Sequence, residues 1–189
     1  MCDPYITLAK KAISTFTKHR RVLSVPADLP SEMLKKRAGV FVSIHRRSTG
    51  ELRGCIGTFL PTCKNIAAEI IQNSISASTQ DPRFLPIQEK ELNDLVVKVD
   101  ILSPPEPTRE EELNPQKYGL IVKNDKGQIG LLLPDIPGVK TKEEQIRICK
   151  EKAFISEEEP VQLFRFTVER HEENQRCNTQ RSSLILKQS

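Results

Sequence analysis

The sequence has no tryptophan, and only 5% of its residues are aromatic. It also lacks an apolar run of the roughly 20 residues that a membrane-spanning helix requires, so we expect no membrane partner. The first residues, MCDPYITLAKK, contain an early acid and no continuous apolar stretch, and a secretory signal is therefore not expected. These absences favour a cytoplasmic protein whose aromatic core depends on seven Phe and two Tyr.

The cysteines do not suit a disulfide framework or a metal site. Five are present, an odd number, and they are widely scattered: Cys2, Cys55, Cys63, Cys149 and Cys177. No CxxC or HxxxH pair occurs, so we expect reduced thiols and no bound metal. Neither a Walker loop nor a dinucleotide fingerprint is present, and no cofactor is predicted.

Charge is distributed unevenly along the chain. The net charge is +4, but residues 1–60 hold 11 Lys or Arg against four Asp or Glu. A basic segment of this kind can bind an anionic partner, although it can equally be a solvated surface. RNA binding would also require aromatic residues among the basic ones, and here only Phe41 and Phe59 lie near the arginines. Nucleic-acid binding is therefore a minor alternative.

Periodic apolar residues predict an N-terminal helix followed by a hairpin, a helix and a strand. Asp3 and Pro4 suit the cap and the first position of a helix, and apolar residues then recur at spacings of three and four. Strand formers around the turn RRSTGE predict a hairpin. A helix opened by Thr62 and a strand over residues 95–102 are expected to follow.

The same order of elements recurs after a linker that is rich in proline and acidic residues. YGLIVKNDKGQIGLLLP predicts a second hairpin, and PVQLFRFTVE predicts a strand. Between them, Thr141 and Glu144 form a capping box for a helix. QIGLLLP resembles CIGTFLP, which pairs Gly130 with Gly57 and indicates an internal duplication.

These elements predict an α+β fold made of an N-terminal helix and two related hairpin–helix–strand units. We expect a single domain over residues 1–169, with internal repeats at about 39–103 and 117–168, and a polar C-terminal tail over 170–189. Features that both repeats contain belong to the scaffold, and features that only one contains are candidates for a functional site.

Several motifs in this order resemble the AMMECR family, named in eukaryotes for a candidate gene region linked to Alport syndrome, midface hypoplasia and elliptocytosis. The hexapeptide LRGCIG, from Leu52 to Gly57, carries the resemblance most specifically. GVFVSI precedes it, and DPRF, VDILSPPE, GLIV, LLLP and CKEKA follow it in family order. The segment DIPGVKTKEEQ departs from the family, which is usually longer there.

The resemblance implies a larger and a smaller lobe with a cleft between them. In microbes the family commonly accompanies a Memo-like protein and a radical-SAM enzyme. It therefore implies these two proteins as possible partners in a shared pathway.

The hexapeptide contains the candidate catalytic residues Cys55 and Arg53. Alternation along a strand places both on one face, with Leu52, Gly54 and Ile56 on the other. A guanidinium near a thiol favours the thiolate, which can act as a nucleophile or be modified covalently. Cys55 can equally be a small buried strand residue, and no His–Asp partner can be proposed for it.

Four further residues are candidates for substrate binding. Gly54 and Gly57 flank the thiol, and Asp81 and Arg83 belong to the DPRF motif that follows the helix. Asp81 can brace the turn, and Arg83 can bind an anion or pair with an acid. A helix-ending turn with an internal Asp–Arg pair is the structural alternative.

Three functions remain open from the sequence. The first is an enzyme or covalent-substrate protein of the Memo/radical-SAM-associated pathway, acting through Cys55 with Arg53 in a small anion-accepting cleft. The second is a non-catalytic protein-interaction module that docks through the hexapeptide. The third is a nucleic-acid-associated regulatory factor in transcription, repair or translation, using the basic N-terminal third.

Overall fold

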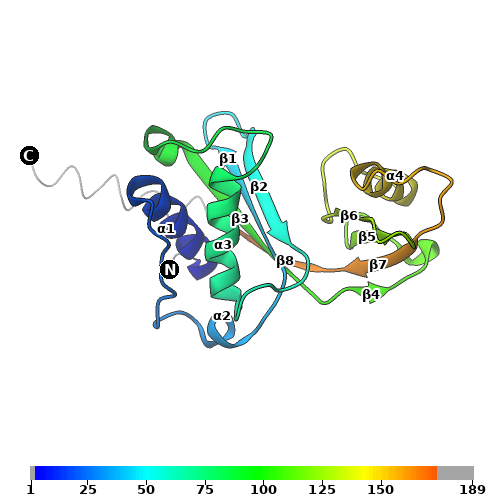
Figure 1. Ribbon diagram of the computed structural model, residues 1–189, viewed down its shortest axis with the longest axis horizontal. Coiled ribbons are helices and arrows are strands. Elements are labelled where there is room, and N and C mark those ends of the chain that lie inside the picture. The colour runs from blue at the N-terminus through cyan, green and yellow to red at the C-terminus, as the bar shows by residue number, and fades with distance from the viewer. Residues whose placement is uncertain (1–2, 174–189) are drawn as a thin grey trace, which may run out of the picture. The chain divides into compact units, whose positions relative to one another are not determined.

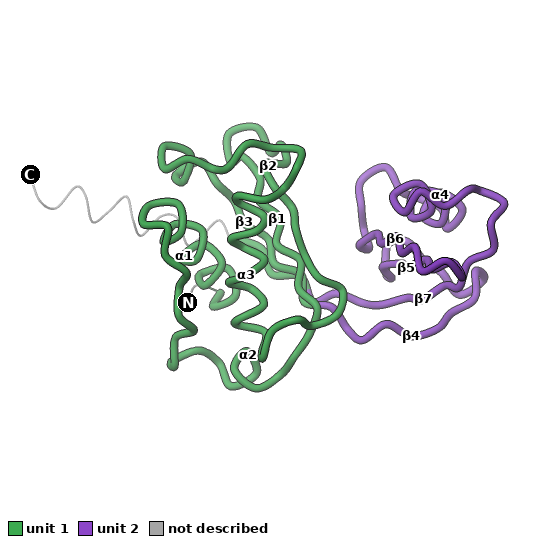
Figure 2. The backbone as a smooth tube through the Cα atoms, in the orientation of Figure 1, with its two compact units in different colours: residues 1–101, 170–189 green, residues 102–169 purple. Residues whose placement is uncertain are grey.

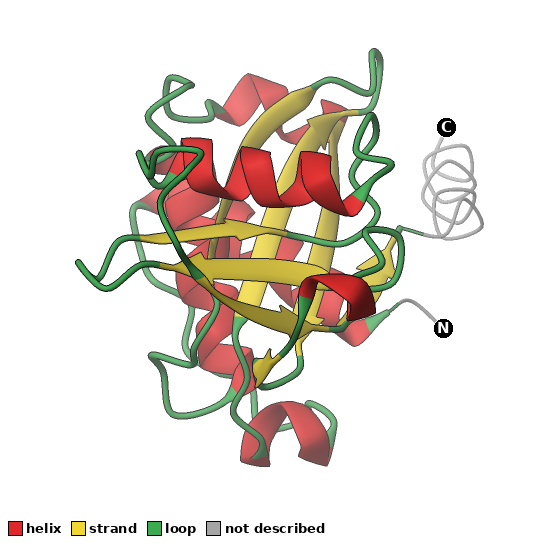
Figure 3. Ribbon diagram, turned by 90° about the vertical axis from the view of Figure 1, so that its right-hand side faces the viewer, coloured by secondary structure: helices red, strands yellow, loops and turns green. Residues whose placement is uncertain are grey.

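The computed structural model describes residues 3–173 and mixes helices with two antiparallel sheets (Figures 1 and 3). The chain divides into two compact units (Figure 2). Unit 1 comprises the residues up to Ile101 and those from Arg170 onwards, and unit 2 comprises Leu102–Glu169. The predicted α+β fold, with a helix near the N-terminus and two antiparallel sheets, is confirmed.

Unit 1 is built around a four-stranded sheet in the order β2-β1-β3-β8. Its elements are α1 (Pro4–His19), α2 (Ser31–Lys35), β1 (Val40–Arg46), β2 (Leu52–Thr58), α3 (Ile66–Thr79), the 3-10 helix η1 (Glu89–Asp94), β3 (Leu95–Leu102) and β8 (Val168–Glu172). The first strand of the hairpin, β1, lies in the middle and pairs antiparallel with both β2 and β3.

The core of unit 1 lies between this sheet and the helices α1 and α3. Val40, Val42 and Ile44 of β1 have no exposed surface and belong to one apolar cluster with side chains of both helices. In α1 the cap is as predicted, because the Asp3 carboxylate accepts the backbone N–H groups of Tyr5 and Ile6 at 2.8 and 3.2 Å.

Helix α3 begins later than the sequence predicts. Its cap is Asn65, whose side-chain oxygen accepts the N–H of Ala68 at 2.9 Å, and the first helical residue is Ile66. Thr62 lies in the preceding loop, where its N–H and hydroxyl both donate to the Glu69 carboxylate. Thr62 therefore binds a helix side chain instead of capping the helix.

Glu69 is a fully buried carboxylate that fixes the loop between β2 and α3. Besides Thr62, it accepts the Thr58 hydroxyl at 2.6 Å and the Cys63 N–H at 2.6 Å. Burial by itself would raise the pKa of Glu69, but the hydrogen bonds from Thr58, Cys63 and Thr62 outweigh it and lower the pKa. The carboxylate is therefore held in its charged form.

The C-terminal strand of unit 1 is anchored by ion pairs to earlier parts of the chain. Arg170 of β8 makes a bidentate contact with Asp100 of β3 at 2.8 and 3.2 Å. Glu173, which follows β8, binds Lys10 and Arg47 at 3.0 and 2.9 Å. The strand thus continues into the predicted tail as far as Glu172, and residues 174–189 of that tail lie outside the described residues.

Unit 2 arranges a hairpin, a helix and a following strand as unit 1 does, but its fourth strand, β4 (Glu106–Pro107), precedes the hairpin, whereas β8 comes last in the chain. Its other elements are the 3-10 helix η2 (Glu110–Glu112), β5 (Gly119–Lys123), β6 (Ile129–Leu132), α4 (Lys142–Lys152) and β7 (Gln162–Phe166). The sheet order is β4-β7-β5-β6, so the first strand of the hairpin is again central. The predicted capping box is present, since the Thr141 hydroxyl accepts the Glu144 N–H at 3.2 Å.

Candidate functional site

Strand β2 carries one extra residue within the hexapeptide. Ile44 of β1 lies opposite Gly54, but the next residue, His45, lies opposite Leu52, which leaves Arg53 unmatched. Such a β-bulge re-aims a side chain and breaks the alternation of the strand. The prediction that Arg53 and Cys55 share one face assumes regular alternation, and the bulge interrupts that alternation at Arg53. Arg53 is buried, with only 7% of its surface exposed.

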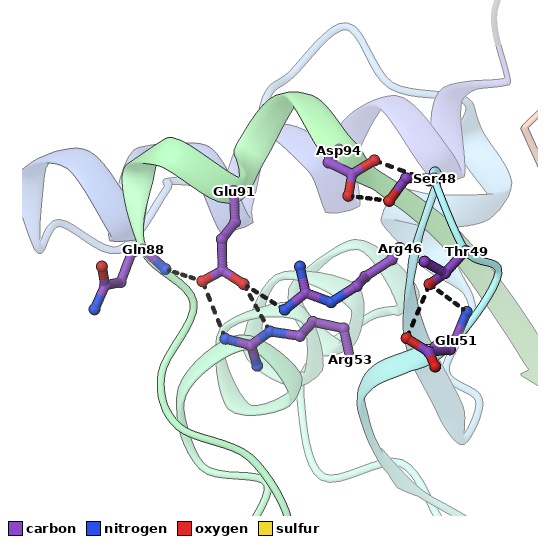
Figure 4. Close-up of polar contacts among 8 residues, drawn as sticks. All are labelled: Arg46, Ser48, Thr49, Glu51, Arg53, Gln88, Glu91 and Asp94. Atoms are coloured by element: carbon purple, nitrogen blue, oxygen red, sulfur yellow. Dashed lines mark hydrogen bonds and ion pairs between the residues drawn. The ribbon is translucent and has the colours of Figure 1, made fainter.

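The Arg53 guanidinium is bound by Glu91 of η1 (Figure 4). Its Nε and one terminal nitrogen donate to the two carboxylate oxygens at 2.8 and 3.1 Å. Arg46 and the backbone N–H of Gln88 bind the same carboxylate at 3.3 and 2.9 Å. The hydrogen bonds from Arg53 lower the pKa of Glu91, so this is a stable ion cluster.

Asp81 links the hexapeptide to the DPRF motif just beyond α3. Its carboxylate accepts the backbone N–H of Cys55 at 2.8 Å and makes two bonds with the Arg83 guanidinium, at 3.0 and 2.7 Å. The hydrogen bond from Arg83 holds the pKa of Asp81 at about 2. The internal Asp–Arg pair expected as the structural alternative is present, and it also ties down the strand that carries the thiol.

The Arg83 guanidinium interacts electrostatically with Cys55. Its side chain is 57% exposed, whereas that of Arg53 is 9% exposed. The hydrogen bond with Asp81 raises the pKa of Arg83, and the charges of Asp81 and ionised Cys55 raise it further. A half-buried thiol therefore lies in the field of a solvent-accessible cation.

Phe84 connects the two arginines. The guanidinium carbons of Arg53 and Arg83 lie 6.0 and 5.5 Å from the centroid of its ring. Both distances fall within the range of cation–π attraction, which restrains the two side chains on one aromatic ring. The next residue, Leu85, is 82% exposed, so the same turn presents an apolar side chain to solvent.

The two candidate glycines have packing roles. A Cβ atom on Gly54 would lie 2.2 Å from the carbonyl oxygen of Ala77 in α3, and one on Gly57 would lie 2.2 Å from the Phe41 ring. In unit 2, a Cβ atom on Gly130 would lie 1.9 Å from the carbonyl oxygen of Cys149 in α4. The structure thus corrects the sequence pairing, because Gly130 shares its environment with Gly54 and not with Gly57.

The other described thiols have different surroundings. Cys149 is fully buried in unit 2, and burial raises its pKa to about 12. Burial also raises the pKa of Cys63, whose thiol donates to the Gln72 amide oxygen at 3.1 Å. Cys2 and Cys177 lie outside the described residues.

Residues 3–173 contain no group of three His, Cys, Asp or Glu side chains placed to hold a metal ion. No helix within them is both long and apolar enough to cross a membrane.

The AMMECR1 family model matches residues 6–171. The chain belongs to the AMMECR1 family. It is also similar to a Thermotoga maritima protein, with 53% identity over 171 residues that cover 89% of this chain and 97% of that protein. A Clostridium acetobutylicum protein is 43% identical over 173 residues, but the match covers 36% of that longer protein.

A solved structure extends the AMMECR1 resemblance to three dimensions. The crystal structure of the uncharacterized protein PH0010 from Pyrococcus horikoshii superimposes with a TM-score of 0.81, at 31% sequence identity and over 90% of each chain. The fold described above is therefore that of a structurally characterised relative.

In this AMMECR1 chain the predicted site residues fall into two neighbouring clusters. Cys55, Asp81 and Arg83 form one, and Arg53 joins the second, around Glu91. Sequence reasoning missed Glu91, because its position in η1 depends on a contact between residues far apart in the chain. The local pattern that could have identified Glu91 is an acid three residues after Gln88, the residue that caps η1. At that spacing its carboxylate can accept the N–H of the cap residue.

Proposed function

We propose that this protein acts through Cys55, as an enzyme or as a protein that is covalently modified, on a reactant with an anionic group that Arg83 binds. One observation carries the proposal. A single carboxylate, that of Asp81, holds both the backbone of Cys55 and the guanidinium of Arg83. Thiol and cation are thus fixed relative to each other by one rigid group.

Asp81 would position these two groups and would not act as a base. A pKa of about 2 makes its carboxylate a poor proton acceptor at neutral pH, where an effective general base has a pKa near the ambient pH. The Cys55 proton would therefore leave to solvent or to the reactant. The guanidinium stabilises the negative charge that remains on sulfur.

Arg83 supplies the selectivity in this proposal. A guanidinium offers five N–H donors, and the Asp81 contacts use two of them. Because the side chain is 57% exposed, a carboxylate or phosphate can approach it from solvent. The Arg53 guanidinium, held by Glu91 and largely buried, is instead a support for the turn through Phe84.

The proposal includes a place in the pathway that the family resemblance implies. Memo-like and radical-SAM proteins are the proposed partners, and a reactive thiol is a plausible recipient or donor of a group in a shared sequence of reactions. Support for this step comes from the family resemblance alone, and co-purification of the three proteins would test it directly.

The test of the site compares a neutral and an anionic alkylating agent. Mass spectrometry follows the rates at which iodoacetamide and iodoacetate alkylate each cysteine of the native full chain. We expect the ratio of the iodoacetate rate to the iodoacetamide rate to be higher at Cys55 than at the cysteine of a short uncharged peptide. Arg83→Gln should lower that ratio at Cys55 by about threefold, the effect of losing one exposed ion pair.

A matched control is Arg109→Gln, which removes an exposed guanidinium from unit 2 and should leave the ratio unchanged. Native Cys55 that reacts no faster than the buried Cys149 would contradict the proposal. So would a rate ratio that Arg83→Gln does not alter.

A docking module is the second candidate function, and the exposed Leu85 favours it. Leu85 lies on the turn that Asp81 and Phe84 rigidify, so it presents an apolar side chain without a large entropy cost. Under this alternative, Leu85→Glu abolishes co-purification of a protein partner while Cys55→Ser leaves it intact. Under the thiol proposal, Cys55→Ser abolishes the activity of the pathway even where co-purification persists.

A further inference from the structure

A groove of about 370 Å³ lies in unit 1, between α3 and the loop that follows α1. The loop contributes Val22, Leu23 and Val25, and α3 contributes a stripe of side chains that includes Ile71 and Ile75. Volumes of this order are typical of sites for small ligands. None of the residues of the Cys55 site lines the groove, so it requires an explanation of its own.

The wall of the groove is apolar and uncharged. Its polar members are the amides of Gln72 and Gln80, the hydroxyl of Ser76 and the thiol of Cys63. Burial raises the pKa of Cys63, so this thiol is protonated and neutral at physiological pH. A charged group placed against this wall would lose its hydration without gaining a partner, so the body of any ligand must be apolar.

One exposed guanidinium lies at the edge of the groove. The Arg37 guanidinium donates to the carbonyl oxygens of Cys63 and Pro61 at 3.1 and 3.2 Å, and it acts electrostatically on the Cys63 thiol. Lys64 next to Cys63, and Arg21 next to Val22, are also exposed. The charge of Glu69 acts on the Cys63 thiol more strongly than that of Arg37 does. Glu69 is, however, fully buried and binds groups of its own loop, whereas the Arg37 side chain is open to solvent.

The groove is elongated along α3. Its lining residues recur at helical spacing from Ala68 to Gln80, which corresponds to a length of about 18 Å at 1.5 Å per residue. A long wall without charged side chains, with a guanidinium at its edge, matches an extended apolar chain that ends in a single negative charge.

We propose that this groove binds one molecule of an amphiphile with an anionic head group, of the long-chain carboxylate type. The alkyl chain lies along the α3 stripe, and the carboxylate pairs with Arg37. This site is independent of the function proposed for Cys55, because it shares no residue with that cluster.

The probe is dodecanoate, used below its micellar concentration with the wild-type full chain and measured by calorimetry. We expect saturable binding of one molecule per chain. Ser76→Trp places a large ring in the middle of the groove and should weaken binding by about tenfold or more, since the ring occupies the space of the alkyl chain. Gln116→Trp adds the same ring at an exposed position of unit 2 and should have no effect.

A second comparison tests the head group. Arg37→Ala should weaken dodecanoate binding by about threefold, as expected for one exposed ion pair, and should leave dodecanol binding unchanged. If Ser76→Trp lowers the thermal stability of the fold, Gln72→Trp, at an exposed position of the same wall, takes its place.

Three results would overturn the inference. They are an absence of saturable dodecanoate binding, binding that persists in both groove-filling variants, and an equal effect of Arg37→Ala on dodecanoate and dodecanol. Binding of an amphipathic peptide without binding of dodecanoate would identify a protein-docking groove and would equally refute the proposed amphiphile.

Discussion

The two units contain the same contact between a strand and a helix but surround it differently. In both, a glycine in the second strand of the hairpin approaches a backbone carbonyl of the following helix: Gly54 at Ala77, and Gly130 at Cys149. In both, the first hairpin strand is the central one. The glycine therefore belongs to the scaffold, because any side chain would separate the strand from the helix.

The difference lies in the residues beside that glycine. Unit 1 has the buried Arg53 and the half-buried Cys55, whereas unit 2 has Ile129 and Leu131 at the corresponding positions. The N–H of Cys55 is bound by a carboxylate, while the carbonyl oxygen of Leu131 accepts a bond from the Lys152 ammonium at 2.8 Å. Unit 2 shows that the shared topology requires neither the thiol nor the ion cluster, which makes both candidates for function.

The largest expected effect tests which glycines correspond. Gly54→Ala and Gly130→Ala should each lower the free energy of unfolding by about 3 kcal/mol, because the new methyl group meets a backbone carbonyl that cannot move alone. Gly57→Ala should cost less, about 2 kcal/mol, because the obstacle is a half-buried side chain, Phe41, that can turn about its Cα–Cβ bond while the backbone stays in place.

Chemical denaturation followed by circular dichroism measures these changes, and hydrogen exchange assigns each one to its unit. The opposite result would be a large destabilisation by Gly57→Ala, equal to that of Gly130→Ala, together with a mild effect of Gly54→Ala. That result would support the pairing of Gly130 with Gly57 that the sequence suggests.

The next largest loss of stability is expected when Arg53 of unit 1 is replaced by isoleucine, the residue type at the corresponding position of unit 2, Ile129. Arg53→Ile should destabilise by about 2 to 3 kcal/mol, because Glu91 keeps its charge while losing its bidentate partner. Arg53→Ile with Glu91→Leu should recover part of the loss, since no buried charge is then left unpaired. Thermal denaturation of both variants measures the difference, and a double variant less stable than the single one would count against this explanation.

The stability that the Asp81 carboxylate gives to unit 1 should depend on pH. The pKa of Asp81 is lowered from 3.8 to about 2, so its contribution to stability is present above about pH 4 and is lost as the pH falls through 2. Asp81→Asn should therefore cost about 2 kcal/mol at neutral pH and progressively less below pH 4. Unfolding by denaturant across this pH range measures it, and a constant difference would argue against the ion pair.

The smallest effect concerns the thiols. Cys55→Ala should change the free energy of unfolding by about 0.5 kcal/mol or less, because the side chain is half-buried and the Asp81 contact uses its backbone. Cys149→Ala should cost about 1 kcal/mol, because that thiol is fully buried in the core of unit 2. Equal costs, measured by thermal denaturation, would show that Cys55 is a packing residue.

Local signals in the sequence were sufficient for most of the fold. The Asp3 cap, the Thr141 capping box and the strand Leu95–Leu102 depend on residues within a few positions of each other, and the structure confirms all three. The Asp81–Arg83 pair is local in the same sense. These predictions required only the geometry of one turn or one strand.

Features that depend on contacts between residues far apart in the chain could not be predicted from the sequence. The bulge at Arg53 depends on the register of β1, and the role of Glu91 depends on packing of η1 against the hairpin. The similarity of QIGLLLP to CIGTFLP aligns Gly130 with Gly57. In the structure, however, Gly130 lies against a helix backbone, as Gly54 does, whereas Gly57 lies against a side chain. The buried ion pair of Arg53 with Glu91 is one of these long-range contacts, and it places Arg53 in a different cluster from Cys55.

The return of the chain to unit 1 through β8 has a consequence for biosynthesis. Unit 2, Leu102–Glu169, is translated between Ile101 and the segment that pairs with Asp100 and binds Lys10 and Arg47. Unit 2 is contiguous and can fold as soon as it leaves the ribosome, whereas the first unit begun is the last completed. A nascent chain that has not yet reached Arg170 leaves Asp100 without its guanidinium, so the sheet of unit 1 is completed only after all of unit 2 has been synthesised.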